Sequence, residues 1–426
     1  MNPFAVTGLF VVAFVAVLLL RLWLCSRQIR HVARHRGEVP PRFAGTVSLA
    51  AHQRAADYTV ARQRFELVSI GWQGAVLIGW TLLGGLNALN SLLLAQVYPH
   101  WGDLAYGVAL LMGASLISSV LDWPLEAWRT FRIEQTFGFN RMTWGLWWRD
   151  RLVGGLLGLA VGAPIAAIVL WLMGATGGTW WLWTFAVLAG FMLLMQVVYP
   201  TWIAPLFNRF QPLPDEALRI RVERLLQRCG FQSQGLFVMD GSKRSAHANA
   251  YFTGFGRSKR VVFFDTLLQK LDGDEIEAVL AHELGHFRRH HVRTRLFIGL
   301  GTLLAGLAIA AWLIQLPAFY LGLGVVPNLL VANHAAGLLL VMWLGGLAGI
   351  FISPWSASLS RRQEFEADAY ACEHGQASAL ASALLKLFAD NASTLTPDPV
   401  YVRFMYSHPP ADQRLAALPL QPAAAT

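Results

Sequence analysis

Two histidines and a glutamate are spaced so that they could form a catalytic metal site. His282, Glu283 and His286 lie in the segment 273–289, whose apolar residues recur with a helical period and whose front end is acidic. On a helix the two imidazoles stand one turn apart, about 6 Å along the axis, so they can bind one Zn²⁺ ion. Glu283 is then placed as the general base for the attacking water. A pair of core or surface histidines is the alternative interpretation.

The third ligand of such a zinc site is not on the same helix. A catalytic zinc site needs three protein ligands and an open fourth position. His290 continues the face of the histidine pair, but it lies about 12 Å along the axis from His282, whereas Zn–N bonds are about 2 Å long. An extended motif with a histidine six residues after His286 is also excluded, because Val292 occupies that position. The ligand must come from elsewhere in the chain.

A second predicted helix, 360–374, carries three acidic residues. Glu364 and Asp368 share one face at about 100° per residue, whereas Glu366 points about 200° away from Glu364. We assign Glu364 as the third ligand and Asp368 as the carboxylate that holds a zinc histidine through its other ring N–H. Glu366 is expected to be solvated or ion-paired. Taken alone, Glu364 would be a surface acid that pairs with a neighbouring arginine; the histidine pair favours the ligand.

Short runs rich in Val and Phe predict two strands ahead of the zinc helix, at 235–240 and 260–265. The intervening stretch 247–252 is a candidate edge, where an extended peptide substrate could pair with the backbone. An ordinary hairpin explains the spacing slightly better, and both interpretations stay open at this point.

A histidine near the C-terminus is held on a turn. In the stretch 407–410, Pro409 and Pro410 prevent a preceding helix from continuing, so His408 is expected at the start of a helix. From there its imidazole could donate a hydrogen bond to the oxyanion of a tetrahedral intermediate. A capping or buried structural histidine is about equally consistent with the sequence.

The elements that position these residues are predicted to lie mostly in a membrane. Of 426 residues, 55% are hydrophobic and 14% charged, against about 25% charged in a soluble domain. These values exclude a soluble or disordered chain, and three widely spaced cysteines exclude a disulfide scaffold. Asn87 and Asn90, in the second span, are expected to face protein or water. Seven apolar stretches could cross about 30 Å of hydrocarbon, near 4–24, 67–97, 104–123, 152–173, 180–199, 292–316 and 336–352.

The basic residues predict the orientation. Eight arginines fall in the first connection, and none of the 34 Lys and Arg residues falls in the outer connections 99–103, 174–179 and 317–335. The positive-inside rule places the N-terminus outside and the polar regions in the cytoplasm. The net charge of +9 then follows from membrane orientation, and we expect the lipid bilayer rather than nucleic acid as a partner. The cationic run 288–291 is most simply headgroup-facing, with a grip on a substrate carboxylate as the alternative.

These expectations describe a mainly α, polytopic membrane protein with seven transmembrane helices and a small α+β, gluzincin-like zinc-peptidase region on the cytoplasmic side. An N-terminal membrane domain, 1–200, would hold five spans. Region 201–291 would hold the candidate substrate strand and the zinc helix. Spans six and seven would occupy 292–353, and 354–426 would supply the third zinc ligand.

The chain resembles the type I CAAX prenyl protease family of integral-membrane zinc metalloproteases. The likeness covers nearly the whole length, and several of its motifs are more specific than the zinc pentapeptide alone. It is carried by the stretches 282–286 (HELGH), 360–368 (SRRQEFEAD), 240–252 (DGSKRSAHANAYF), 137–140 (FGFN) and 407–410 (SHPP).

The resemblance implies a ring of seven helices around a large water-filled chamber, with one Zn²⁺ ion per chain near its cytoplasmic side. It also implies that an extended substrate pairs with the backbone of one strand. The matching positions imply zinc ligands (His282, His286, Glu364), a catalytic base (Glu283), residues that assist catalysis (His408, Asp368) and residues that contact the substrate (Asn249, Ala250, Tyr251, Arg414).

The predicted activity is hydrolysis of peptide bonds near the C-terminus of CAAX-type peptides, prenylated in the family. Only four of the 34 basic residues are lysines, which weakly favours a GC-rich bacterial genome and hence a bacterial cytoplasmic membrane. There, a membrane protein quality-control protease without prenyl specificity is the alternative. A non-catalytic transporter or scaffold is the alternative of another class. It is disfavoured because the spans hold few ionisable residues away from their ends and the zinc residues are intact. The oligomeric state is not predicted.

Overall fold

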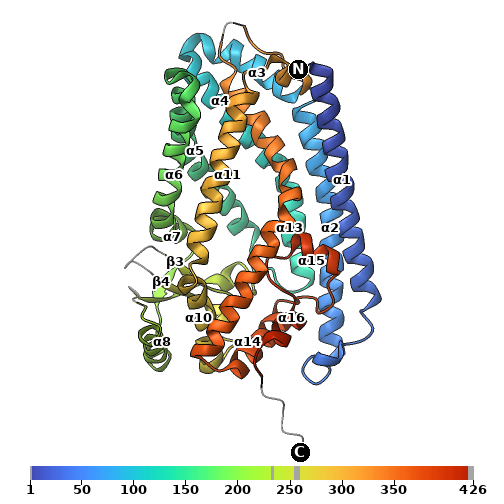
Figure 1. Ribbon diagram of the computed structural model, residues 1–426, viewed down its shortest axis with the longest axis vertical. Coiled ribbons are helices and arrows are strands. Elements are labelled where there is room, and N and C mark those ends of the chain that lie inside the picture. Colours follow the sequence, from blue (N-terminus) through green and yellow to red (C-terminus); the bar gives the residue numbers. More distant parts are fainter. Residues whose placement is uncertain (1, 232–234, 254–259, 330, 421–426) are drawn as a thin grey trace, which may run out of the picture.

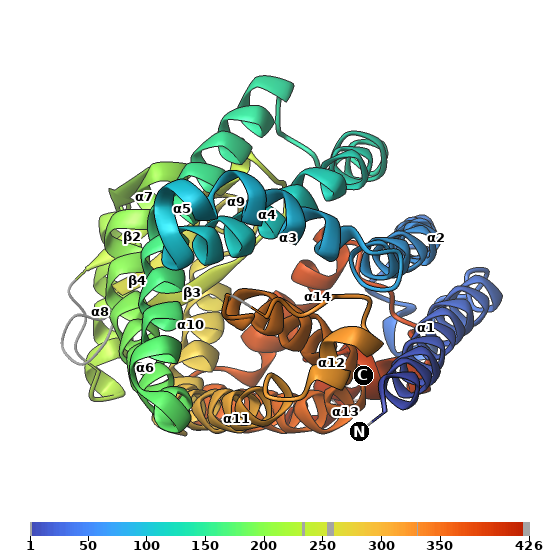
Figure 2. The same cartoon turned by 90° about the horizontal axis from the view of Figure 1, so that it is seen from above.

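Long apolar helices form most of the computed structural model, which describes residues 2–231, 235–253, 260–329 and 331–420. Among these residues, six helices could cross a membrane by length and composition, or seven if the bent pair α2 and α3 is one span. Figure 2 shows these helices arranged around the periphery of the molecule. The prediction of a multi-pass membrane protein is therefore confirmed. The long helices are α1 (Pro3–Arg34), α2 (Leu49–Trp80), α3 (Gly85–Gln96), α4 (Tyr98–Trp128), α5 (Trp144–Ala175), α6 (Trp180–Val198), α11 (His291–Leu313) and α13 (His334–His374).

The predicted second span is divided into two helices. The axes of α2 and α3 differ by 46° across a short break. Gly84 has a φ of 79°, which glycine adopts without a steric cost, and a Cβ on Gly85 would lie 2.6 Å from the Gly79 carbonyl oxygen. Asn87 and Asn90 both form hydrogen bonds with protein groups, as expected.

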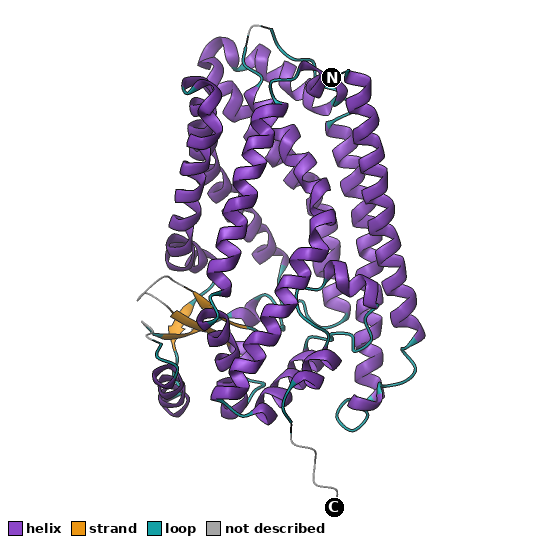
Figure 3. Cartoon of the chain, viewed as in Figure 1, coloured by secondary structure: helices purple, strands orange, loops and turns teal. Residues whose placement is uncertain are grey.

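A small sheet and the shorter elements gather at one end of the bundle (Figures 1 and 3). In the part of the chain that the structure describes, the sheet has four strands in the order β1-β2-β4-β3. These elements are β1 (Phe210–Pro212), β2 (Leu236–Met239), β3 (Ala250–Thr253), β4 (Arg260–Phe264), α7 (Ala204–Phe207), α8 (Glu216–Arg228), α9 (Asp265–Leu268), α10 (Gly273–Arg288), α14 (Ala377–Asp390), α15 (Pro399–Met405) and α16 (Ala411–Ala417). At the opposite end lies α12 (Pro317–Gly322).

Strand β3 satisfies both interpretations of the stretch 247–252. It pairs antiparallel with β4, with Ala250 opposite Phe263, as a hairpin would. It is also the last strand in the described sheet order, so its other side is an edge. The connection between the two strands, 254–259, lies outside the described residues. The two strands predicted at 235–240 and 260–265 are confirmed as β2 and β4.

The zinc helix α10 forms where its sequence predicted it. The Asp272 carboxylate accepts hydrogen bonds from the first backbone N–H groups, and the Glu275 side chain returns to the Asp272 N–H, which completes a capping box. Ile276, Leu280 and Leu284 are buried in a core shared with α8, the sheet and α14. This core is separate from that of the membrane helices, so α10 is fixed by the apolar packing of its own region.

The acidic helix predicted at 360–374 is not a separate element. It continues from the seventh span as the 41-residue helix α13, so the expected end near Ile352 is wrong. Pro354 has no N–H to donate, but the Ser353 hydroxyl donates to the Ile350 carbonyl at 2.9 Å. One rigid helix thus runs from the membrane into the candidate site.

Candidate metal centre

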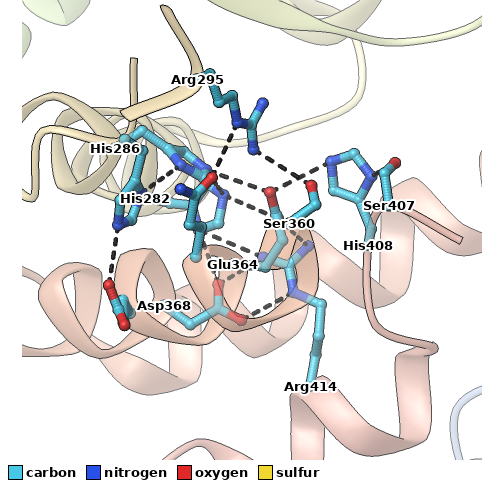
Figure 4. A network of polar contacts seen from close by, with 12 residues as sticks. His282, His286, Arg295, Ser360, Glu364, Asp368, Ser407, His408 and Arg414 are labelled. Atoms are coloured by element: carbon cyan, nitrogen blue, oxygen red, sulfur yellow. Dashed lines mark hydrogen bonds and ion pairs between the residues drawn. The ribbon is translucent and has the colours of Figure 1, made fainter. Parts of the chain in front are cut away.

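Helices α10 and α13 approach each other closely at Gly285. A Cβ at this position would lie 2.9 Å from the Ala367 Cα, so only glycine permits the observed contact. Gly285 lies between His282 and His286 in the chain. The contact therefore brings both imidazoles onto the face of α13 that carries Glu364 (Figure 4).

The three predicted ligands converge at distances that suit one tetrahedral ion. The Nε2 atoms of His282 and His286 lie 3.3 Å apart. One Glu364 oxygen lies 3.5 Å from His282 Nε2, and the other lies 3.3 Å from His286 Nε2. Ligands of a tetrahedral zinc ion, with bonds of about 2.0–2.1 Å, are about 3.3 Å from one another. The three side chains therefore fit one ion and leave a fourth position free.

A buried carboxylate oxygen at the same place accepts no hydrogen bond from the described residues. Glu364 Oε2 is buried and receives no hydrogen bond from any described residue. Leaving a carboxylate oxygen unsatisfied in the interior costs free energy, which a cation between the three side chains would offset. Two imidazole nitrogens and one carboxylate oxygen are also a donor set of catalytic zinc sites. The residues present therefore fit the metal that the sequence predicts.

Asp368 and Arg414 hold one of the imidazoles. Asp368 Oδ1 accepts a hydrogen bond from His282 Nδ1 at 2.8 Å, which leaves Nε2 directed towards Glu364. Arg414 is buried; its Nε donates to Asp368 Oδ2 at 2.8 Å, and its Nη1 lies 3.8 Å from Glu364 Oε2. Burial opposes the charged form of His282, but the neighbouring carboxylates of Asp368 and Glu364 raise its pKa to about 9. Arg414, expected to contact the substrate, is engaged by the site carboxylates.

A second chain of hydrogen bonds, which sequence reasoning missed, holds His286. Its Nδ1 lies 2.9 Å from the Nδ1 of His291, and His291 Nε2 donates to Glu366 Oε2 at 3.0 Å. Because the His291 proton is on Nε2, His286 Nδ1 must donate, and its Nε2 keeps a lone pair for the metal position. His291 is buried, so its placement in a headgroup-facing run is wrong. Glu366 is ion-paired, as expected, with His291 and Arg362.

Glu283 lines a cavity of about 610 Å³. Two of the three candidate ligands, His282 and Glu364, line the same cavity. Burial raises the pKa of its carboxyl, and the nearby imidazoles of His282 and His286 partly oppose that rise. A carboxylate whose pKa is raised towards neutrality suits general acid and base work. Ala248, Asn249 and Ala250 line the same cavity, whereas Tyr251 does not and packs its ring against Phe264.

His408 lies on the turn before α16 and is open to the cavity. Its side chain is 64% exposed, and its Nε2 lies 3.5 Å from Glu364 Oε1. A buried structural histidine is thereby excluded. The turn is held from α13, because Arg361 Nη1 donates to the carbonyls of Val402 at 2.9 Å and Tyr406 at 2.7 Å. Arg361 thus caps the C-terminal end of α15 instead of pairing with Glu364.

The chain is similar to known membrane peptidases over almost its whole length. Residues 28–209 match the family described as "CAAX prenyl protease N-terminal, five membrane helices", and residues 212–420 match "Peptidase family M48". The CAAX prenyl protease 1 homolog of Arabidopsis thaliana is 34% identical over 89% of this chain and 90% of that protein. CAAX prenyl protease 1 of Saccharomyces cerevisiae is 31% identical over 93% and 91%. The crystal structure of S. mikatae Ste24p matches with a TM-score of 0.91 at 28% identity, covering 99% of this chain and 100% of that one.

Proposed function

The chain belongs to peptidase family M48, and we propose that the metal of this membrane metallopeptidase is zinc, held by His282, His286 and Glu364. The observation that carries the proposal is the set of mutual ligand distances, 3.3 to 3.5 Å, around a buried Glu364 oxygen that accepts no hydrogen bond from the described residues. Family membership alone would leave open which residues bind the ion, and the geometry supports these three.

The reaction is hydrolysis of a peptide bond. When bound, zinc would polarise the scissile carbonyl as a Lewis acid. Glu283 removes a proton from the attacking water and later delivers it to the leaving amine, and its raised pKa supports both transfers. His408, exposed in the cavity, donates a hydrogen bond to the oxyanion. Asp368 keeps His282 in the tautomer that leaves its Nε2 free, and Arg414 fixes Asp368.

The substrate binds as an added strand. Backbone groups of the segment 249–251 form hydrogen bonds with an extended peptide at the free edge of β3, and Asn249 and Ala250 line the cavity beside the zinc helix. Tyr251 lies opposite Val262 of β4, and its ring packs against Phe264, so it supports this edge from within the sheet. Main-chain pairing of this kind accepts many side chains, so it positions the scissile bond without defining the sequence.

The substrates are CAAX-type peptides, which is the specificity that the names of the relatives carry. A second cavity, of about 450 Å³ between α1, α2 and α13, supports an apolar group on the substrate, because Val17, Ile70 and Leu347 line it. It shares Tyr401 and Met405 with the catalytic cavity. A quality-control protease without prenyl specificity is the second candidate. The scarcity of lysine favours it, because few lysines indicate a GC-rich bacterial genome, in which prenylated substrates are not expected.

One pair of peptides distinguishes the two candidates. A farnesylated CAAX peptide and its unprenylated twin are incubated with the purified protein, and the products are identified by mass spectrometry. Preferential cleavage of the farnesylated peptide supports CAAX processing. Equal cleavage of both supports the quality-control activity. Glu283→Gln should abolish cleavage of both peptides while zinc stays bound, and retained cleavage by this variant would refute the role of Glu283.

The catalytic end faces the cytoplasm of a bacterial cell, with the N-terminus outside the cytoplasmic membrane. The support is the absence of Lys and Arg from the outer connections of the sequence. Figure 1 places the N-terminus at the end of the bundle away from α10, α14 and α16. A fusion of green fluorescent protein to the C-terminus should fluoresce in bacteria, because green fluorescent protein folds and becomes fluorescent in the cytoplasm. A dark but full-length, membrane-inserted fusion would contradict the orientation.

A further inference from the structure

One cation in the catalytic cavity forms no ion pair with a described residue. Arg62, on α2, is exposed and lines the cavity that also holds Glu283. It forms no ion pair with any carboxylate in the part of the chain that the structure describes; its guanidinium lies over the face of the Tyr58 ring, 5.5 Å from the centroid, and its charge helps to lower the pKa of Glu134. Arg414, also in the cavity, is buried against Asp368. Arg62 is therefore available to an anion that enters the cavity.

The surroundings of Arg62 hold its side chain in place, and no described residue accepts a hydrogen bond from its guanidinium. The Tyr58 hydroxyl donates to both oxygens of Glu134, at 2.8 and 3.0 Å, which fixes the ring under the guanidinium. Glu134 is thus occupied by Tyr58 and lies close to His247, 3.8 Å away. An arginine stacked on an aromatic ring keeps its planar fork of N–H groups open, and that fork matches a carboxylate bidentately.

The sheet indicates which end of a peptide would arrive near Arg62. An extended peptide that adds to β3 in the commoner antiparallel sense runs opposite to β3, from residue 253 towards residue 249. Its C-terminal end then continues towards Ala248 and His247. These two residues are bound by the Asn391 side chain, at 3.3 Å and 3.1 Å, and Asn391 lines the cavity together with Arg62.

Resting on the proposed peptidase activity, we propose that Arg62 binds the C-terminal α-carboxylate of the substrate and so restricts efficient cleavage to a bond near a free chain end. Two independent relationships converge on this assignment. The direction of the added strand leads the substrate's C-terminus past Asn391. The Arg62 guanidinium, which forms no ion pair with a described residue, lines the same cavity beside Tyr58. A substrate whose C-terminus is amidated lacks the anion and leaves Arg62 unpaired.

The experiment compares two peptides that differ only at the C-terminus, a free acid and an amide. Cleavage by the full-length protein in detergent gives KM and kcat for each peptide. Fluorescence anisotropy of labelled peptides that bind to the Glu283→Gln variant gives Kd for each peptide without turnover. Arg62→Met removes the charge and keeps the apolar stem. Arg64→Met is the matched control, because Arg64 is exposed on the same helix, about 200° away around its axis, and does not line the cavity.

The wild-type protein should bind the amide about 10- to 100-fold more weakly than the acid, with the loss in KM and with kcat nearly unchanged, as expected for a charged hydrogen bond. Arg62→Met should remove this preference, and Arg64→Met should retain it. If Arg62→Met unfolds, Arg62→Gln, which keeps a hydrogen-bond donor, serves in its place. Equal Kd values for acid and amide, or a preference that survives the loss of Arg62, would overturn the assignment.

The binding arm separates this inference from the proposed activity. If neither peptide is cleaved but the acid still binds more tightly through Arg62, the peptidase proposal fails and the carboxylate site stands. If both peptides are cleaved with equal KM, the peptidase proposal stands and the carboxylate site fails.

Discussion

Asp368 Oδ1 and His282 Nδ1 lie 2.8 Å apart, in a pair that is buried on both sides. The carboxylate can only accept, so the Nδ1 proton is held by Asp368, and Nε2 is left to bind the proposed ion beside Glu364. A structural contact made by α13 thereby determines which nitrogen of an α10 side chain can bind a metal. The same helix carries Glu364, the proposed carboxylate ligand, so ligand and orienting group move as one body.

Asp368→Asn should weaken zinc binding by about 10- to 100-fold, the usual cost of removing a carboxylate that orients a metal-bound histidine. The amide can no longer balance the charge of Arg414, and it can present N–H instead of oxygen to the ring. Zinc affinity is measured by competition with a chelator. Glu373→Gln, an exposed acid on the same helix, is the control and should bind zinc as the wild type does. Unchanged affinity in Asp368→Asn would contradict the orienting role.

Gly285→Ala should separate α10 from α13. The new Cβ would lie 2.9 Å from the Ala367 Cα and 3.1 Å from the Tyr370 Cβ, and neither backbone nor β-carbon can move without the helix. We expect a loss of about 1–3 kcal/mol in the free energy of unfolding, the usual cost of overpacking, together with weaker zinc binding. Thermal unfolding in detergent measures the first effect.

Gly301→Ala, in α11, is the matched substitution, since its Cβ would meet no atom within 4 Å. It should be neutral or stabilising by up to about 1 kcal/mol, because alanine is the better helix former. Equal melting temperatures for the two variants would show that the α10–α13 contact can relax.

Glu275→Gln should lower stability at neutral pH, by about 1 kcal/mol for a damaged helix cap. Burial opposes ionisation of Glu275, but hydrogen bonds from Lys386 and Ser382 lower its pKa below the usual value. A lowered pKa gives stability that is present above the unfolded-state pKa of about 4.3 and is lost as pH falls through the folded-state value. The melting temperatures of wild type and variant should therefore converge as the pH falls below the unfolded-state pKa and through the lower folded-state pKa. A constant difference down to pH 3 would contradict the ionised pair.

Local sequence was sufficient to predict the zinc helix. The acidic front end at Asp272 and Glu275 and the helical spacing of Ile276, Leu280 and Leu284 all lie within one segment, so they required no knowledge of distant contacts. The shared face of Glu364 and Asp368 followed in the same way from helical periodicity. The meeting of the two segments could be expected from the chemistry, because a catalytic zinc site requires a third ligand.

Turn geometry, tertiary packing and a side-chain hydrogen bond explain what the sequence could not predict. His291 looked like part of a cationic run, and only the turn between α10 and α11 brings it beneath His286. Arg414 looked free to meet a substrate, but α16 packs it against Asp368. The end expected near Ile352 marked the end of the apolar stretch, but the helix continues past it, and the Ser353 hydroxyl bonds the Ile350 carbonyl that Pro354 leaves unpaired.

The zinc content of the purified chain decides whether His282, His286 and Glu364 form one metal site. Elemental analysis after dialysis should give about one zinc ion per chain for the wild type and for Glu373→Gln, as for a catalytic site with three protein ligands. Glu364→Gln, which keeps the size of the side chain and removes its charge, should lose most of the zinc under the same dialysis. Full zinc occupancy in Glu364→Gln, or a wild-type protein that is active and free of zinc, would contradict the site.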